Sequence, residues 1–190
     1  MTKLDRKTKE TNISCEIDIY GTGKSNINTG IGFFDHMLES FSKHSSIDIT
    51  LLCEGDLHID AHHSVEDCGI VLGTALKKEI FPIKNIERYG NSTVVMDEAS
   101  TTCALDLSNR PFLYFKLDVF GKVGEFDLEL IEEFFNALII NSGITCHIIN
   151  DRGSNKHHIV ESTFKSFAVA LRRAMVVNKK LGIPSTKGIL

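Results

Sequence analysis

Two stretches of the sequence, DAHHSVED at 60–67 and NKHHIVES at 155–162, decide how the fold is interpreted. Both contain the pattern His-His-x-x-Glu, and the second copy lies 95 positions after the first. The same offset relates ALKK at 75–78 to ALRR at 170–173. Amphipathic helices can resemble one another by chance, but this match includes histidines as well as apolar residues. Similarity at one fixed offset predicts an internal duplication, with repeats of about 1–90 and 91–190 inside a single domain.

The bulk composition excludes several classes of protein. Of 190 residues, 42% are hydrophobic and 24% are charged, which is ordinary for a globular chain. The net charge of −4 does not indicate a nucleic-acid-binding protein, which would carry an excess of positive charge. The charged start MTKLDRKTKE is unlike a secretory signal, and no apolar run approaches the length of a membrane span. The five scattered cysteines predict reduced thiols. We therefore expect a cytoplasmic protein with no nucleic-acid or membrane partner.

The spacing of apolar residues predicts similar elements in both halves. Alternation indicates strands, and a stripe at helical spacing indicates helices. The expected strands are 12–20, 47–53, 112–120 and 144–149. The expected helices are 31–44, 62–78, 127–140 and 157–177. Segments 92–97 and 101–107 look like a hairpin added between the halves. The predicted class is α+β, an internal duplication of a small sheet-plus-helices unit with two-layer packing.

The stretch GTGKS at 21–25 resembles the end of a phosphate-binding loop. Such a loop needs a glycine where this chain has Asp18, and no helical pattern follows it. We therefore expect GTGKS, and also NTG at 28–30, to form turns.

The paired histidines have the geometry of metal ligands. On a helix, His62 and Glu66 lie on one face, so both can reach one ion. His63 is rotated by about 100° from His62 and points elsewhere. The two motifs therefore suit two shared metal sites, each with histidines from both repeats. Imidazole and carboxylate donors suit Mn, Fe, Co or Zn, and the lack of thiolate argues against structural zinc.

Further ligands are expected on the helices that precede the motifs. Aligning strands 47–53 and 144–150 places His36 opposite Glu133, so each site could collect three imidazoles and a carboxylate, or two of each. Glu133 could instead be an ordinary surface carboxylate. We assign one ion to His36, His63, His157 and Glu161, and the other to His62, Glu66, Glu133 and His158.

Other histidines and carboxylates receive different interpretations. His44, His58 and His147 have no repeated partner, so they are expected to be structural or to support a ligand. Asp35, Asp60 and Asp67 are candidates for orienting the imidazoles of metal ligands by hydrogen bonds.

Several stretches together resemble the imidazoleglycerol-phosphate dehydratase family, and the resemblance covers almost the whole chain. They are IGFFDHMLESFSKH at 31–44, CEGDLHIDAHHSVEDCGIVLGTALKK at 53–78, DLSNRPFLYFK at 106–116, HHIVESTFKSFAVALRRA at 157–174 and PSTKGIL at 184–190. The resemblance implies a monofunctional hydro-lyase of L-histidine biosynthesis. It would remove water from D-erythro-imidazole glycerol phosphate to give imidazole acetol phosphate.

The resemblance also implies the fold, the cofactor and the assembly. The fold would be a duplicated unit of the ribosomal protein S5 domain 2-like type. Each active site would hold two Mn²⁺ ions and lie where subunits meet in a homo-oligomer of twenty-four chains. Ions around the substrate ring would stabilise an imidazolate and a diazafulvene-like intermediate as the hydroxyl leaves. His62 and Glu66 would then be catalytic as well as metal-binding.

The family pattern assigns further roles outside the histidine motifs. Glu10 matches an acid/base group that also contacts the substrate, although by sequence alone it is a solvated charge near a terminus. A second set matches contacts to the substrate phosphate, through forked guanidinium donors and point charges: Arg88, Arg110, Lys165, Ser185 and Lys187. Individually these cations would be solvated. The apolar end of PSTKGIL suggests docking onto a neighbour, with a disordered tail as the alternative.

Four positions depart from the pattern: Ser40, where glutamine is common, Ser45 and Asn109, where glycine is common, and Glu133, which is histidine in some members. We expect an altered substrate contact at Ser40.

Two other classes of function stay open. One is a different di-metal enzyme such as a phosphatase, which would release inorganic phosphate. The other is a non-catalytic metal-binding shell, which would not need converging Arg88, Arg110 and Lys187.

Overall fold

The computed structural model describes residues 1–188 and contains two similar units. The first unit is a four-stranded sheet with two helices. Its sheet has the order β1-β2-β4-β3, and only β3 and β4 run parallel. The elements are β1 (Thr2–Lys7), β2 (Thr11–Asp18), β3 (Ser25–Asn28), α1 (Gly32–Ser45), β4 (Asp48–Gly55) and α2 (His62–Ile80).

The second unit repeats this plan. Its sheet has the order β5-β6-β10-β7, again with one parallel pair. The register agrees as well. Asp18 of β2 pairs with Asp48 of β4, and the equivalent residues of the second sheet, Asp106 of β6 and Thr145 of β10, also pair. The elements are β5 (Tyr89–Met96), β6 (Ala99–Asp106), β7 (Phe112–Lys116), β8 (Lys122–Val123), β9 (Phe126–Asp127), α3 (Leu130–Ser142), β10 (Thr145–Arg152) and α4 (Lys156–Ala174).

The predicted fold class is confirmed, but two predictions about strands are wrong. The hairpin of β5 and β6 is the counterpart of β1 and β2, and is not an addition between the halves. The strand that follows, β7, corresponds to β3 and not to the strand predicted at 12–20. Both errors arise because β1 and β3 are edge strands with mostly polar sequences, TKLDRK and SNIN, which lack an apolar pattern. The insertion in the second unit is instead the short β8–β9 hairpin.

GTGKS forms a loop around a carboxylate of the chain itself. The backbone N–H groups of Thr22 and Lys24 donate to the Asp48 carboxylate at 2.7 and 2.8 Å. These hydrogen bonds hold the pKa of Asp48 below its usual value. The loop then leads into β3, so the prediction that it is not a phosphate-binding loop is consistent with its structure.

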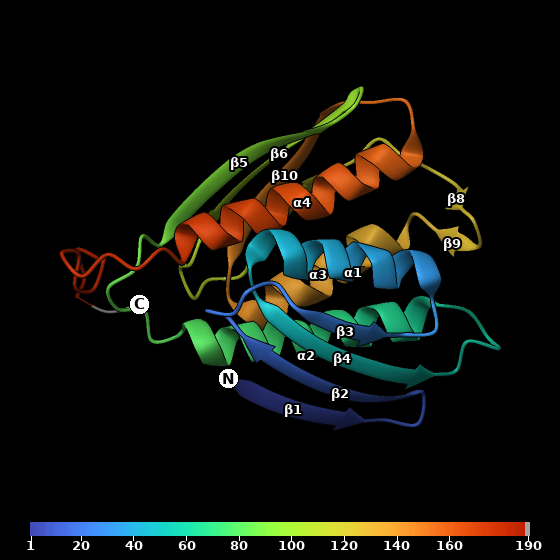
Figure 1. The fold of residues 1–190 in the computed structure, drawn as a ribbon, viewed down its shortest axis with the longest axis horizontal. Helices are drawn as coiled ribbons and strands as arrows, with labels where there is room; N and C mark the ends of the chain where they lie inside the picture. Colours follow the sequence, from blue (N-terminus) through green and yellow to red (C-terminus); the bar gives the residue numbers. More distant parts are fainter. Residues whose placement is uncertain (189–190) are drawn as a thin grey trace.

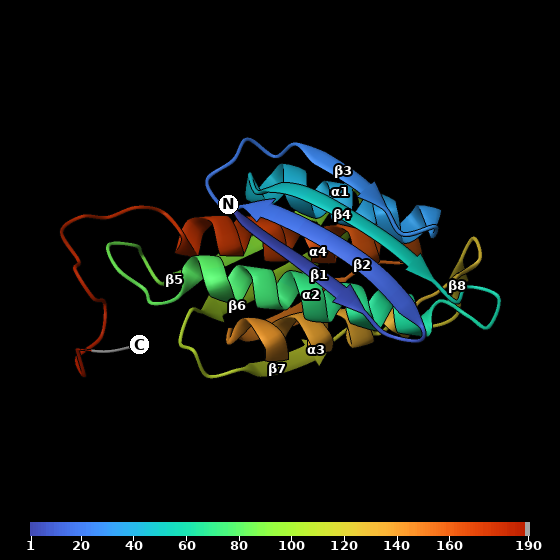
Figure 2. The same ribbon diagram turned by 90° about the horizontal axis from the view of Figure 1, so that it is seen from below.

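Helices α1 to α4 lie between the two four-stranded sheets (Figures 1 and 2). Within each unit, α2 packs on β1 and β2, and α4 packs on β5 and β6. Between units, α2 packs on α3 and α1 packs on α4. The seam between the units is filled by buried phenylalanines, such as Phe34 against Phe134 and Phe41 against Phe167, with ring centroids 5.2 and 5.6 Å apart. Burial of these large rings stabilises the joined pair of units.

This arrangement brings three helix starts to one end of the molecule. In Figure 1, α1, α2 and α4 all begin at the right, and the C-terminal tail lies at the left. The helix starts carry the two His-His-x-x-Glu motifs and His36. None of the helices in residues 1–188 is long and apolar enough to cross a membrane.

Candidate metal centre and active site

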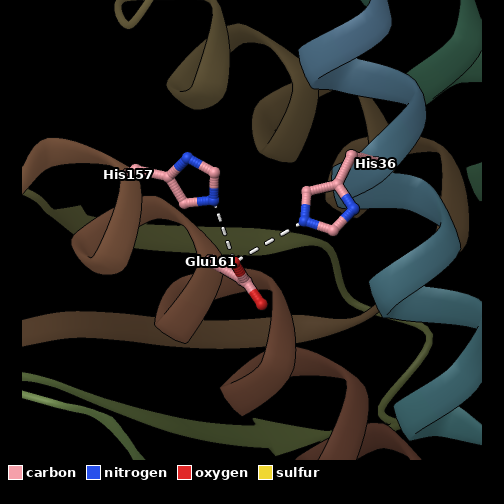
Figure 3. Close-up of side chains that lie close together, drawn as sticks. All are labelled: His36, His157 and Glu161. Atoms are coloured by element: carbon pink, nitrogen blue, oxygen red, sulfur yellow. Dashed lines mark hydrogen bonds and ion pairs between the residues drawn. The ribbon is translucent and has the colours of Figure 1, made fainter.

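His36, His157 and Glu161 gather at the start of α4 (Figure 3). His157 Nε2 lies 3.0 Å from Glu161 Oε2, and His36 Nε2 lies 3.7 Å from the same oxygen. His157 and Glu161 are one turn apart on α4, and His36 reaches them because α1 packs beside α4. The other Glu161 oxygen accepts a charged hydrogen bond from Lys165 Nζ at 2.7 Å. Lys165 therefore fixes the carboxylate while leaving one oxygen facing both imidazoles.

The three side chains fit a divalent cation. Their ligand atoms all lie within 4.8 Å of one another, and two nitrogens with one oxygen form a donor set for Mn, Fe, Co or Zn. Glu161 is buried, which raises the pKa of its carboxyl, but Lys165 and His157 lower it below its usual value. The carboxylate is thus held in the charged form that a metal ligand requires.

The motif at the start of α2 is more open. His62 Nε2 and Glu66 Oε2 are 3.8 Å apart, and both side chains are almost half exposed. The His63 ring faces two carboxylates, with Nδ1 3.0 Å from Asp56 Oδ2 and Nε2 3.7 Å from Glu10 Oε1. The hydrogen bond to Asp56 raises the pKa of His63. Asp56 thereby orients the ring so that Nε2 points toward the side where Glu10 lies.

A carboxylate also contacts a histidine of the second motif. His158 Nδ1 lies 2.8 Å from Glu98 Oε2, and Glu98 Oε1 accepts the backbone N–H groups of Ser154 and Asn155. These bonds lower the pKa of Glu98 to about 2 and raise the pKa of His158. Because Nδ1 donates to Glu98, Nε2 of His158 keeps a lone pair for a metal ion.

Asp56 and Glu98 were missed in the sequence analysis. A signal existed for Glu98, since it lies 88 residues after Glu10, the offset that relates β2 to β6. The predicted orienting residues have other partners among the described residues. Asp35 accepts hydrogen bonds from Thr29, and Asp60 caps the backbone N–H of His62. Asp67 binds Arg6 and Thr11, so its contacts are not with an imidazole.

The single chain gathers only part of each predicted ligand set. Of the first set, His36, His157 and Glu161 come together, while His63 lies beside Asp56 and Glu10. Of the second set, only His62 and Glu66 are neighbours. The remaining two members lie elsewhere: Glu133 lines a hollow of about 380 Å³ beside β7, and His158 binds Glu98.

Four of the five predicted phosphate contacts surround one hollow of about 450 Å³. They are Arg88, Arg110, Ser185 and Lys187. Arg88 is buried and uses its donors on the Asp106 carboxylate and the Pro184 carbonyl, which ties the tail to β6. Arg110 is 71% exposed. Lys165 is the exception, because it pairs with Glu161 at the histidine cluster. Residues 189–190, the apolar end of the tail, lie outside the described residues.

Two further positions bear on departures from the family pattern. Asn109 adopts a left-handed backbone conformation with φ of 54°, which asparagine tolerates better than other residues with a side chain. Ser40 is buried inside α1, and its hydroxyl has no hydrogen-bond partner in residues 1–188.

The histidine cluster and the cationic hollow lie at opposite ends of α4. The backbone N–H of Arg88 donates to the carbonyl of Ala174 at the last turn of α4, whereas His157 lies at its first turn. Seventeen residues of helix span about 25 Å. A small substrate therefore cannot contact both groups of one chain at once.

The fold and the site define a duplicated α+β enzyme with a histidine–glutamate cluster of the kind that binds divalent metals. Comparison with known proteins gives the particular family. The model of the family described as imidazoleglycerol-phosphate dehydratase matches residues 29–171. The chain is 72% identical to an imidazoleglycerol-phosphate dehydratase of Aliarcobacter butzleri and 66% identical to one of Campylobacter hominis, each over all of both chains.

Solved structures give the same result. The imidazoleglycerol-phosphate dehydratase of Staphylococcus aureus is 40% identical, with a TM-score of 0.82, over 93% of this chain and 98% of that one. The protein from Pyrococcus furiosus is 36% identical, with a TM-score of 0.85, over 98% and 100%. This chain belongs to the imidazoleglycerol-phosphate dehydratase family, and it is a lyase. The family and the enzyme class predicted from the sequence are confirmed.

Proposed function

We propose that the chain removes water from D-erythro-imidazole glycerol phosphate and gives imidazole acetol phosphate, a step of L-histidine biosynthesis in the cytoplasm. Family membership supports the dehydratase activity. The observation that carries the metal-dependent part is the convergence of His36, His157 and Glu161 from two helices. The reaction breaks one C–H bond and one C–O bond, and the enol that remains becomes the ketone.

The proposed cofactor is a pair of Mn²⁺ ions in each active site. His36, His157 and Glu161 would hold one ion together with His63, and His62, Glu66, Glu133 and His158 would hold the other. Bound metal supplies Lewis acidity that favours loss of the ring N–H proton and stabilises developing negative charge. The donor types support a divalent transition metal, and manganese follows from the family resemblance.

Glu10 is the proposed acid/base group. Its carboxylate is about half exposed and lies 3.7 Å from His63 Nε2, beside a predicted metal ligand. A carboxylate in this position can take a proton from a substrate carbon and return it to the product. Its backbone is fixed, because the N–H of Asp56 donates to the Glu10 carbonyl at 3.1 Å.

The cationic hollow is the proposed phosphate site. Arg110 and Lys187 line it with exposed charges, and Ser185 adds a hydroxyl. Arg88 adds its charge and holds the tail through the Pro184 carbonyl. Removing the chain from Pro184 onward should therefore raise KM sharply, and unchanged kinetics would reject this role for the tail.

We also propose that the active site forms between copies of the chain. The separation of about 25 Å between the histidine cluster and the cationic hollow supports this assembly, because the two groups can meet one substrate only if they come from different subunits. A homo-oligomer of twenty-four subunits follows from the family resemblance. Each subunit would be a single domain with repeats of about 1–90 and 91–190, which is supported by the start of the second sheet at Tyr89.

The decisive experiment measures turnover of imidazole glycerol phosphate by metal-stripped protein, with and without added Mn²⁺. We expect turnover only with metal, and a product that keeps its phosphate. Release of inorganic phosphate would instead identify a phosphatase. The variant Arg110→Ala tests the non-catalytic alternative. For this variant we expect lost turnover with intact assembly. If the unaltered protein showed no turnover with any metal, the non-catalytic metal-binding shell would be the better interpretation.

A further inference from the structure

The turn that carries Glu10 is fixed by contacts that leave the Glu10 carboxylate free. The Thr8 N–H donates to the Thr11 carbonyl at 2.9 Å, and the Thr8 hydroxyl accepts the N–H of Glu10 at 3.0 Å and the N–H of Thr11 at 2.9 Å. These bonds close the turn between β1 and β2. They set the direction of the Glu10 backbone, but they do not attach the turn to the helix that bears His63.

A buried carboxylate on α2 makes that attachment. Asp67 is 6% exposed. Its Oδ1 accepts Arg6 Nε at 3.2 Å and an Arg6 terminal nitrogen at 2.9 Å, and its Oδ2 accepts the Thr11 hydroxyl at 2.5 Å. Arg6 lies near the end of β1, and Thr11 begins β2. One side chain therefore holds both strands where they enter the turn.

We propose that Asp67 is a positioning residue that holds Glu10 at a fixed place relative to α2 and its histidines. The proposal rests on the acid/base role proposed for Glu10. Asp67 directly follows Glu66, so the attachment starts at the same helical turn as the predicted metal ligands. Charged hydrogen bonds of this kind are short and strong, so they add to the single backbone hydrogen bond from Asp56 to Glu10 in limiting movement of this turn near the chain terminus.

The second repeat shows what happens without this attachment. At the offset of 88, Ala99 replaces Thr11, and at the offset of 95, Ser162 replaces Asp67. Neither side chain can reproduce the charged hydrogen bonds. There the equivalent carboxylate, Glu98, binds the loop before α4 and His158 with both of its oxygens. In the first repeat, where Asp67 holds the turn, the Glu10 carboxylate makes no close hydrogen bond among the described residues and lies 3.7 Å from His63 Nε2.

The test uses Thr11→Val, which removes one hydroxyl at nearly constant volume. A misplacement of about 1 Å can cost about 100-fold in rate, so we expect kcat to fall by about 10- to 100-fold. KM and metal content should stay unchanged, because the phosphate contacts and metal ligands are intact. Thr11→Ser keeps the hydroxyl and should restore kcat. The matched control is Thr93→Val, which removes one exposed hydroxyl and its hydrogen bond to the Thr102 hydroxyl between β5 and β6, and should leave kcat unchanged.

Hydrogen exchange gives a second measurement that does not depend on turnover. The amides of residues 8–11 should exchange faster in Thr11→Val than in the unaltered protein, and Thr11→Ser should restore protection. If the unaltered protein does not dehydrate the substrate, the proposed function is wrong, and exchange still tests the attachment.

Two outcomes would overturn the proposal. The first is unchanged kcat and exchange in Thr11→Val. The second is loss of bound metal in parallel with kcat, since that would mean that the network acts on α2 and not on Glu10. Asp67→Asn adds a stronger perturbation at the other end of the network, and where it does not fold, the Thr11 variants decide the question.

Discussion

The starts of α2 and α4 carry the same His-His-x-x-Glu motif in different surroundings. At α4, Glu161 is buried, Lys165 neutralises it, and His36 crosses from α1 to complete a cluster. At α2, Glu66 is almost half exposed, and the residue equivalent to His36, Glu133, lies apart. The two repeats thus share the histidines and glutamate of the motif but differ in the side chains that surround them. Within one chain, α4 therefore carries a partial cluster and α2 carries an open pair of ligands, which fits the proposal that the active site forms between copies of the chain.

The largest expected effect tests whether both motifs are needed despite this difference. His62→Ala and His157→Ala should each reduce turnover by more than ~100-fold, because removal of a ligand weakens one ion at least as much as loss of its supporting partner. Turnover and bound metal, measured by elemental analysis, check this. His58→Ala removes an exposed loop histidine and is the control. Near-normal activity with full metal content in either ligand variant would refute the shared-site scheme.

A second comparison separates the two equivalent turn carboxylates. Glu98→Gln should lower metal affinity by about 10- to 100-fold, because Gln does not fix the tautomer of His158 as a carboxylate does. Glu10→Gln should leave metal affinity unchanged and abolish most turnover. Calorimetric titration with Mn²⁺ and steady-state kinetics measure both effects. Equal metal affinities in the two variants would contradict the assignment of metal binding to Glu98 and of acid/base chemistry to Glu10.

A third comparison concerns packing. On α2, a Cβ added at Gly73 would lie 2.4 Å from the Leu138 carbonyl oxygen of α3. The equivalent position on α4 is Ala168, which is buried. Gly73→Ala should therefore destabilise the fold by about 1–3 kcal/mol through overpacking. Urea unfolding measures this. Gly32→Ala, where the new methyl meets open space, should change stability by less than about 0.5 kcal/mol.

The smallest effect is a pH dependence of the metal-free protein. Glu98 raises the pKa of His158 above its usual 6.5. A group with a raised folded pKa stabilises the fold fully below its unfolded pKa, and this stabilisation is lost as pH rises through the folded pKa. Tm of the chelated protein, relative to Glu98→Gln, should thus fall as pH rises through and above 6.5. A difference in Tm that is constant between pH 5.5 and 8.5 would contradict this interpretation.

The sequence could predict elements with strong periodicity and could not predict those without it. The four helices lie close to their predicted ranges, because apolar stripes and the offset of 95 identify them. The polar edge strands β1 and β3 were missed, since their positions depend on pairing with β2 and β4. Contacts such as Glu98 with His158 were missed for a similar reason. They join residues 60 apart in the sequence, and the packing of α4 on β5 and β6 brings them together.

The helix layer has a further consequence for the origin of the chain. The contact of α1 with α4 and the contact of α3 with α2 are the same contact made twice, because α3 corresponds to α1 and α4 to α2. Self-complementary contacts of this type are those of twofold-symmetric dimers. A half-length chain could bury these helix faces only by pairing with a second copy. The link at 81–88 replaces that concentration-dependent pairing with a permanent one, and it frees the two halves to diverge.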